Sequence, residues 1–280
     1  MRVVCAGHIN WDVRLRVDRL PDPDDEARVR DRSASGGGSA ANVAVCLSRL
    51  GIDTRLLGSV GDDDTGREAL ADIRAAGVDP SVTVVEDAET TTKYILIDVD
   101  GEVALLGTDG ANEALGPADV SPELFDGAEL VHLTGQRPDT ARHIADLAVD
   151  RDVFVSFDPG RRLPDRDYAD VLDRTDLLFV TDREAEAIEA AVPRQVTKHG
   201  VGGATYAGPE GEYSHAGFGV ESVVDTTGAG DAFAAGFLSS WLAERDPEHA
   251  LSVGNAAGAL AASTYGPRPD LPSDPLSEVR

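Results

Sequence analysis

The sequence predicts an α/β protein with a mainly parallel central sheet and a smaller β-sheet beside it. Through most of the 280 residues, short apolar segments alternate with amphipathic segments of helical period, which is the pattern of βαβ units. Two other segments, residues 13–32 and 92–106, alternate apolar and charged residues and are typical of hairpins with one solvated face. Because no internal repeat is present, we expect a single α/β domain over residues 1–280, with residues 13–33 and 91–108 inserted as the small sheet.

Each element is indicated by its period and by the residues at its ends. Residues 3–6 are an apolar run that stops at Gly7, as in a buried first strand. The turns PDPDDE, residues 21–26, and DVDG, residues 98–101, divide the two hairpins. The other elements expected, in chain order, are a helix over 40–50, a strand over 54–60, a helix over 65–76, a strand over 130–133, a helix over 140–149, strands over 153–157 and 177–180, a helix beginning at 181, a strand and glycine turn over 196–203, and helices over 232–242 and 251–264. Gly51, Gly77 and Gly266 are expected to end the first, second and last of these helices.

The charge of the chain is strongly negative. There are 51 acidic and 25 basic residues, a formal net charge of −26, and the only lysines are Lys93 and Lys198. Such a surface repels nucleic acid and anionic membranes, so we expect neither as a partner. The acidic residues are spread along the chain, and at molar salt, where the Debye length is about 3 Å, their mutual repulsion is screened. We therefore predict a halophile's protein whose fold loosens at low salt.

The cysteines and the N-terminus indicate the redox state and the compartment. Cys5 and Cys46 are far apart in sequence, lie in apolar surroundings and belong to no CxxC pair or Cys/His cluster, so we expect core thiols, with no zinc site and no disulfide. The chain starts directly with a strand and has no run of about 18 apolar residues. We expect a cytoplasmic protein.

The stretch DTTGAGDAFAAGFL, residues 225–238, predicts an anion site with a base next to it. Gly228, Ala229 and Gly230 have little or no side chain, so their N–H groups can turn toward a phosphate at the positive end of the following helix. Asp231 falls in the first turn of that helix, where its carboxylate can accept a proton from a substrate hydroxyl. The alternative is a tight turn with an aspartate cap and no chemistry.

The same stretch resembles the second signature of the PfkB, or ribokinase-like, family of sugar and nucleoside kinases. Residues 37–42, GGSAAN, resemble the first signature, and residues 110–112, GAN, match a further family motif. The resemblance covers nearly the whole chain. It implies a ribokinase-like three-layer α/β/α fold in which segments 13–33 and 91–108 form a β lid over the sugar and also the contact of a homodimer.

The resemblance also implies roles for individual residues. Asp231 matches the catalytic base, and the anion hole is formed by Gly228, Ala229 and Gly230. The positions that match substrate-binding residues are Asn10, Asp12, Gly37, Gly38, Asn42 and Arg161. Arg161 belongs to a DPx(x)R stretch, and the alternative is that it is a surface residue. Those that match nucleotide-binding residues are Thr197, Gly200, Gly203 and Asn255. Ser39 stands where ribokinases proper have lysine.

Metal sites are implied at two positions. Glu184 matches the glutamate of an NxxE motif that organises water and Mg²⁺ around the phosphates, although Thr181 replaces the asparagine of that motif. Asp225 matches a residue that helps to hold a monovalent cation, K⁺ or Na⁺, beneath the anion hole. His199, a lone histidine in a glycine turn, is interpreted as structural or solvated.

Two other motifs are considered and rejected. Gly36, Gly38 and Ala41 satisfy the GxGxxA spacing of a dinucleotide site, but the preceding RVRDRSAS makes a poor buried strand, which that motif requires. GDDDTG, residues 61–66, lacks the spaced ligands of a calcium loop and is better explained as a helix N-cap.

These observations predict an ATP- and Mg²⁺-dependent kinase that phosphorylates a hydroxymethyl group of a small sugar or sugar derivative. A nucleoside kinase is the nearest alternative, favoured by GHINWD and FDPG. A sugar sensor without catalysis on the same fold is a third hypothesis, and the intact Asp231 argues against it.

Overall fold

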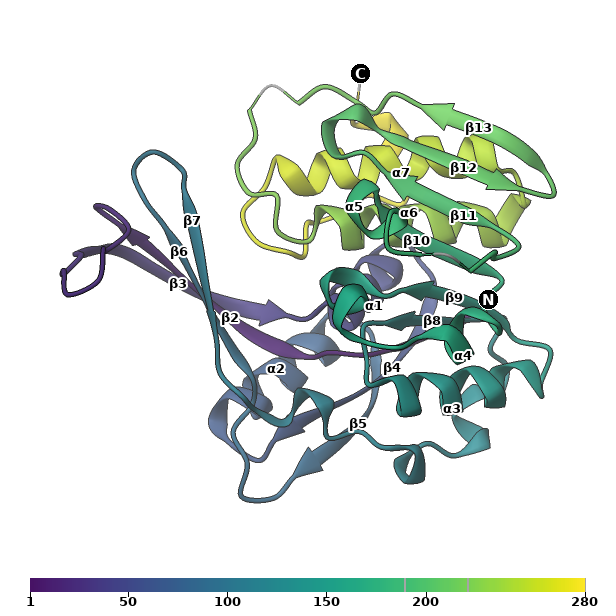
Figure 1. The fold of residues 1–280 in the computed structure, drawn as a ribbon, viewed down its shortest axis with the longest axis horizontal. Helices are drawn as coiled ribbons and strands as arrows, with labels where there is room; N and C mark the ends of the chain where they lie inside the picture. Colours follow the sequence, from purple (N-terminus) through teal and green to yellow (C-terminus); the bar gives the residue numbers. More distant parts are fainter. Residues whose placement is uncertain (189, 221, 280) are drawn as a thin grey trace.

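A nine-stranded sheet forms the centre of the molecule. The computed structural model describes residues 1–188, 190–220 and 222–279. The strand order is β13-β12-β11-β10-β9-β8-β1-β4-β5 (Figure 1). The strands are β1 (Arg2–Ala6), β4 (Asp53–Gly61), β5 (Asp79–Val85), β8 (Leu130–Thr134), β9 (Phe154–Asp158), β10 (Leu177–Thr181), β11 (Gln195–Lys198), β12 (Ala204–Gly208) and β13 (Gly211–His215). From β5 to β11 all neighbours are parallel, and β12 and β13 continue the sheet as antiparallel strands.

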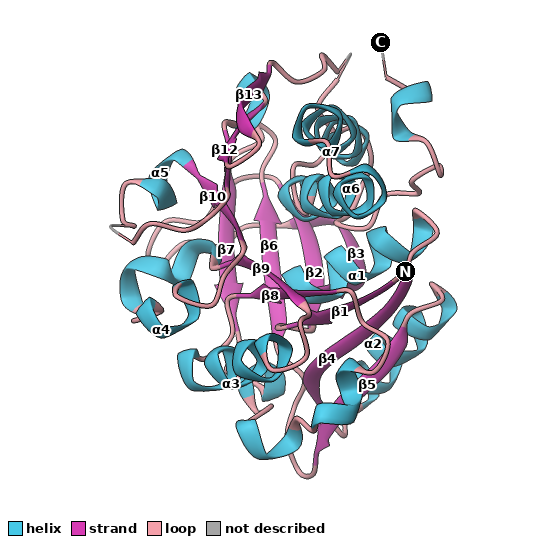
Figure 2. Ribbon diagram, turned by 90° about the vertical axis from the view of Figure 1, so that its right-hand side faces the viewer, coloured by secondary structure: helices cyan, strands magenta, loops and turns pink. Residues whose placement is uncertain are grey.

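Helices cover both faces of this sheet (Figure 2), which confirms the three-layer α/β/α architecture. One face carries α1 (Ser39–Arg49), α2 (Asp64–Ala75), α6 (Ala229–Glu244) and α7 (Pro247–Ala262), and the other carries α3 (Pro138–Val149), α4 (Ala169–Leu172) and α5 (Asp182–Ala185). Successive residues of β1 belong to different cores, since Val3 packs with α1 and α6 while Val4 packs with α3. Burial on both faces explains why this strand is a continuous apolar run.

The small sheet is formed by the two expected hairpins. Its strands are β2 (Asn10–Val17), β3 (Val29–Gly37), β6 (Thr92–Ile97) and β7 (Val103–Gly107), in the order β3-β2-β6-β7. It projects from the body of the molecule in Figure 1. The parallel pairing of β2 with β6 joins the hairpins and places Asp12 opposite Lys93. β3 pairs antiparallel with β2 in this sheet and is not a central parallel strand, which confirms the rejection of a dinucleotide site.

Several sequence-based boundaries are corrected by the structure. Strands β5, β12 and β13 were not expected, because none of them is a continuous apolar run. The helix expected from residue 181 is the single turn α5, and residue 189 of the expected segment lies outside the described part of the chain. Helix α7 ends at Ala262 before reaching Gly266, whose N–H donates to the carboxylate of Asp225 at 3.1 Å.

Other expectations are confirmed. Asp63 caps α2 by accepting from the N–H of Gly66 at 2.8 Å, as expected for GDDDTG. Cys5 and Cys46 are buried free thiols. None of the helices in the described part of the chain has both the length and the apolar character that crossing a membrane requires.

Candidate active site

The carboxylate of Asp231 lies at the start of a helix whose position is tightly constrained. Gly228 caps α6 in the left-handed conformation, with φ of 76°, and a Cβ there would lie 2.4 Å from the carbonyl oxygen of Pro267. Only glycine fits such a position. The helix that follows is apolar on all sides and almost wholly buried. Its first N–H groups, which have no acceptor within the helix, are therefore held in place beside Asp231.

The surroundings of Asp231 adjust its basicity. The side-chain amide of Asn42 on α1 donates to the Asp231 carboxylate at 2.8 Å, and Arg268 donates to the amide oxygen of Asn42 at 3.1 Å. Burial raises the pKa of Asp231 to about 6, although the Asn42 hydrogen bond opposes that shift. A carboxylate with this pKa is ionised at neutral pH and is a stronger base than an exposed one.

Lys198, at the end of β11, lies beside Gly230 and was not among the site residues that the sequence predicted. Its ammonium group is 2.6 Å from a carboxylate oxygen of Asp158 and 3.7 Å from the point that a Cβ on Gly230 would occupy. Burial lowers the pKa of Lys198, but the charge of Asp158 and its hydrogen bond outweigh burial, so the pKa is raised and the ammonium stays charged. Both Lys198 and Lys93 lower the pKa of Asp231 through their charges. The signal was present in the sequence, because the two lysines of this lysine-poor chain both reach the site.

The glycines of the first signature bring Asp12 and α1 together. A Cβ on Gly37 would lie 2.3 Å from the Asp12 carboxylate, and one on Gly38, whose φ is 94°, would lie 2.3 Å from the carbonyl oxygen of His8. Asp12 is buried, and burial raises its pKa against the opposing charges of Lys93 and other cations. One of its carboxylate oxygens has no hydrogen-bond partner within the described residues. Buried polar atoms are normally paired, so this oxygen suits a ligand hydroxyl.

A second group of polar side chains surrounds Lys93. The Asn10 and Asn112 side-chain amides are 2.7 Å apart, and with its amide oxygen turned toward Lys93, Asn10 accepts a hydrogen bond from the ammonium group at 2.9 Å. A cavity of about 280 Å³ adjoins these residues, and its lining includes His8, Lys93, Thr108, Asn112, Glu113 and Arg162. Asn10 and Asn112, from segments remote in sequence, are thus brought together with Lys93 beside Asp12.

Glu113, which also lines this cavity, bonds several basic side chains. Arg166 donates to both of its carboxylate oxygens, at 2.8 and 2.9 Å, Arg162 donates at 3.1 Å, and His8 lies 2.9 Å away. The hydrogen bond with His8, followed by that with Arg166, lowers the pKa of Glu113 to about 2. Arg162 lines the cavity and Arg161 does not, although both side chains are exposed. Because the 3₁₀ turn of residues 160–165 directs Arg162 toward Glu113, Arg162 is better placed than Arg161 for the expected substrate contact.

The expected nucleotide residues lie around the edge formed by β11, β12 and β13. Gly200 and Gly203 have φ of 59° and 87°, and a Cβ on Gly203 would lie 1.9 Å from the carbonyl oxygen of His215. Asn255 on α7 is 3.1 Å from Nδ1 of His215, so Gly203 and Asn255 meet at that residue. Thr197 is adjacent to Lys198 on β11. His199 bonds Asp182 at 2.6 Å and Thr205 at 3.0 Å, which supports its structural interpretation.

Comparison with known proteins agrees with this arrangement. Residues 1–274 match the sequence profile described as pfkB family carbohydrate kinase. The chain belongs to the pfkB family. It is 52% identical over 279 residues to the ATP-dependent ribose-1-phosphate kinase of Halopiger xanaduensis, which covers 96% of this chain and 94% of that protein. It is 28% identical to the nucleoside kinase of Methanothermobacter thermautotrophicus, over 96% of this chain and 92% of that protein.

The fold of this pfkB-family kinase is shared with solved structures. Ribokinase from Thermotoga maritima superposes with a TM-score of 0.88 at 21% identity, over 99% of this chain and 98% of that one. This confirms the ribokinase-like fold, and the family match confirms a carbohydrate kinase.

The position expected to bind Mg²⁺ in this family contains one carboxylate, that of Glu184. Oε2 of Glu184 accepts from the N–H of Thr181 at 2.8 Å, and the Thr181 hydroxyl accepts from the Glu184 N–H, so both form the capping box of α5. This explains the threonine at position 181. Among residues 1–188, 190–220 and 222–279, no three His, Cys, Asp or Glu side chains cluster to hold a metal. A single buried glutamate fits a Mg²⁺ ion that arrives with nucleotide phosphates and keeps most of its waters.

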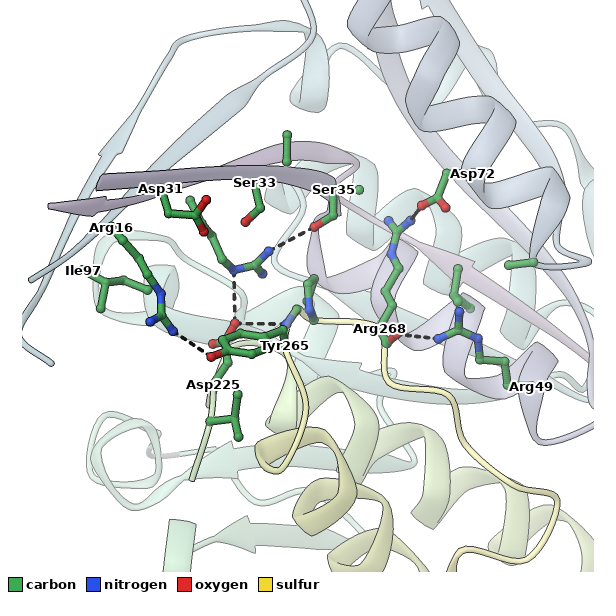
Figure 3. Close-up of a pocket in the computed structure, with 18 residues that line it drawn as sticks. Arg16, Asp31, Ser33, Ser35, Arg49, Asp72, Ile97, Asp225, Tyr265 and Arg268 are labelled. Atoms are coloured by element: carbon green, nitrogen blue, oxygen red, sulfur yellow. Dashed lines mark hydrogen bonds and ion pairs between the residues drawn. The ribbon is translucent and has the colours of Figure 1, made fainter. Parts of the chain in front are cut away.

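The monovalent-cation position of the family does not fit a metal ion in this chain. The carboxylate of Asp225 faces a guanidinium group, because Nε of Arg14 lies 3.1 Å from Oδ2. It also accepts from the N–H groups of Thr227 at 2.8 Å and Gly266 at 3.1 Å. Figure 3 shows this carboxylate at the edge of a cavity of about 740 Å³ between the small sheet and the loop that carries Tyr265. The expected K⁺ or Na⁺ at Asp225 is therefore not supported.

Proposed function

We propose that this kinase transfers a phosphoryl group from ATP, with Mg²⁺, to the hydroxymethyl group of ribose 1-phosphate or a closely related pentose 1-phosphate. The observation that carries the proposal is the pair of cations, Lys93 and Arg162, in the cavity next to Asp12, because a substrate that already has a phosphate needs cationic groups there. The 52% identical relative named as a ribose-1-phosphate kinase supports the same substrate.

The charges around the cavity favour a second anion over a neutral sugar end. Lys93 and Arg162 line it, and two carboxylates, Asp109 and Glu113, also do so. Glu113 is already matched by its bonds with Arg162 and Arg166. Lys93 makes its side-chain hydrogen bond to the uncharged Asn10, and its charge is therefore available to a phosphate. Because Arg166 already binds both oxygens of Glu113, Arg162 and Lys93 can both turn to an anionic ligand in the cavity.

The proposed mechanism assigns one task to each part of the site. Asp12 and the backbone at Gly37 and Gly38 hold ribose hydroxyls, while Asp231 accepts the proton of the attacking hydroxyl. The amides at 228–230 and the ammonium of Lys198 neutralise charge on the phosphoryl group in transit. Magnesium, held by ATP and by water on Glu184, would neutralise the nucleotide phosphates. Closure of the small sheet as a lid would exclude water, the competing acceptor.

The test is turnover in molar KCl with MgATP and three classes of acceptor: ribose 1-phosphate, free ribose and nucleosides. We expect the highest kcat/KM for ribose 1-phosphate. Arg162→Gln should raise the KM for that substrate about tenfold or more while leaving turnover of ribose unchanged, because it removes one charge-assisted contact. The matched control is Arg161→Gln, which alters the exposed neighbour and should change neither.

The same experiment separates the other hypotheses. A nucleoside kinase is the second candidate, favoured by His8, which lines the same cavity and could contact a nucleoside base there. Higher kcat/KM for a nucleoside than for ribose 1-phosphate would overturn our proposal in its favour. No turnover of any acceptor by folded protein would favour the sugar sensor.

We also propose a homodimer through the small sheet. Five large apolar side chains are exposed on its second hairpin: Tyr94, Val99, Val103, Leu105 and Leu106. Exposed apolar side chains gathered on one hairpin suit a protein interface. Light scattering in molar KCl should give the mass of a dimer, and Leu106→Glu should convert it to a monomer; a monomeric unaltered protein would contradict this.

A further inference from the structure

We infer that the guanidinium group of Arg14 is a built-in cation beneath the anion hole, so that catalysis in this kinase needs no bound K⁺ or Na⁺. The inference concerns the loop that carries Asp225 and is independent of which acceptor is phosphorylated.

The first observation is the contact itself. Arg14 and Asp225 are each only 9% exposed, and the guanidinium Nε lies 3.1 Å from the carboxylate. Although burial raises the pKa of Asp225, hydrogen bonds from Thr227 and the charge of Arg14 lower it overall, so the carboxylate is ionised. A buried carboxylate without a counter-charge is strongly unfavourable. Arg14 supplies that counter-charge, and its guanidinium remains charged at every working pH.

The second observation is that both oxygens of this carboxylate already have partners, although a cavity adjoins it. Oδ1 accepts from Thr227, and Oδ2 accepts from Gly266 as well as facing Arg14. A metal ion at Oδ2 would lie directly against the guanidinium, and two like charges at such a distance repel. Arg14 is itself fixed, since its Nη1 donates to the hydroxyl of Ser35 on β3 at 3.1 Å. Figure 3 shows the dashed contacts that reach Ser35 and Asp225.

The third observation is where this ion pair lies. Asp225 holds the turn that leads into α6 through Thr227, and Gly266 precedes Pro267, whose carbonyl contacts Gly228. The ion pair between Arg14 and Asp225 therefore holds in place the loops that contact the proposed anion hole. Because Arg14 belongs to β2, two residues beyond Asp12 on the same face, the cation is carried by the strand that holds the sugar. Arg14 is thus a positioning residue that links the small sheet to the phosphate site.

The decisive experiment compares chloride salts of potassium, sodium and tetramethylammonium at equal ionic strength. We expect the unaltered protein to have the same kcat, within about twofold, and the same thermal unfolding midpoint in potassium and sodium salts as in the tetramethylammonium salt. Saturable activation by K⁺ or Na⁺, with at least a fivefold rise in kcat, would overturn the inference. This arm needs no variant, so it stands even if a substitution prevents folding.

A variant tests the role of the guanidinium directly. Arg14→Ala opens space beside Asp225, so its kcat should fall at least tenfold in tetramethylammonium chloride and recover when K⁺ or millimolar guanidinium ion is added. The same cations should raise its unfolding midpoint, a readout independent of turnover. Arg16→Ala is the matched control, since Arg16 lies on the same face but bonds the hydroxyl of Tyr265. Full activity of folded Arg14→Ala without these cations, or a loss that none of them reverses, would refute the assignment.

Discussion

Asn42 donates a hydrogen bond to Asp231 at 2.8 Å and so connects two residues that are 189 positions apart in the sequence. The amide oxygen of Asn42 accepts from Arg268, so its nitrogen must point toward the carboxylate. The expectation was that Asn42 bonds substrate hydroxyls. In this structure its side-chain amide bonds Asp231 and Arg268, and the bond to Asp231 limits the pKa of that carboxyl.

Removing that hydrogen bond should shift the pH profile. The bond lowers the pKa of Asp231, so Asn42→Ala should raise it and move the acidic limb of kcat/KM upward from about pH 6 by roughly one unit. Rates measured between pH 5 and 9 test this. Asn255→Ala is the control, because that asparagine bonds His215 and is not in contact with Asp231. An unchanged acidic limb of the kcat/KM profile in Asn42→Ala would mean that the Asn42 hydrogen bond does not alter the pKa of Asp231.

Asp231→Asn should separate activity from stability. Turnover should fall by about 10²–10⁴, the usual contribution of a general base, while sugar binding persists. The folded-state pKa of about 6 exceeds the ordinary aspartate pKa of 3.8, so the native state binds the extra proton and wild-type stability falls as pH rises from about 4 through 6. Asparagine does not titrate, so the variant does not lose stability over this pH range. Its unfolding midpoint should exceed that of the wild type by several degrees above pH 6, with the difference shrinking toward pH 4. Residual turnover above roughly 1% would show that Asp231 is not the base.

Variants of Lys198 and Asp158 can distinguish a structural role of Lys198 from a catalytic one. Lys198→Met leaves the Asp158 carboxylate without its partner at 2.6 Å and should lower both stability and kcat. The double variant Lys198→Met/Asp158→Asn removes both charges and should recover most of the stability, but kcat should stay at least a hundredfold low because the anion hole has lost its cation. Unfolding midpoints and kcat of the wild type, Lys198→Met, Asp158→Asn and the double variant complete the double-mutant cycle. Recovery of kcat in the double variant would assign Lys198 a purely structural role.

Salt should stabilise this protein strongly. With a net charge of −26, repulsion between surface carboxylates is large at low ionic strength and screened at molar salt. The unfolding midpoint, followed by circular dichroism, should rise steadily from 0.1 to about 3 M KCl. Sucrose at matched osmolality is the control, since it favours compact states without screening charge. Equal stabilisation by sucrose and KCl would argue against charge repulsion as the cause.

Elements with local signals could be predicted from the sequence. The helix expected over 232–242, observed as Ala229–Glu244, the glycines at 37, 38 and 228 and the two hairpins were predicted, because periodicity, turn residues and close backbone approach are visible within a few residues. Strands β5, β12 and β13 left no comparable trace, because none of them is a continuous apolar run. Their place was decided by pairing with strands already in the sheet.

Which side chains share the site depends on how distant parts of the chain pack together. Lys198 reaches Gly230, Arg268 reaches Asn42, and Arg14 reaches Asp225, each across a long stretch of sequence. Which of two adjacent arginines, 161 or 162, faces the cavity depends on the direction of one short turn. The sequence around a charged residue follows the same local pattern whether its side chain lies on a solvated surface or beside a buried partner. Its partner is determined by the packing of elements remote in the chain, and that packing placed Arg14 against the carboxylate of Asp225.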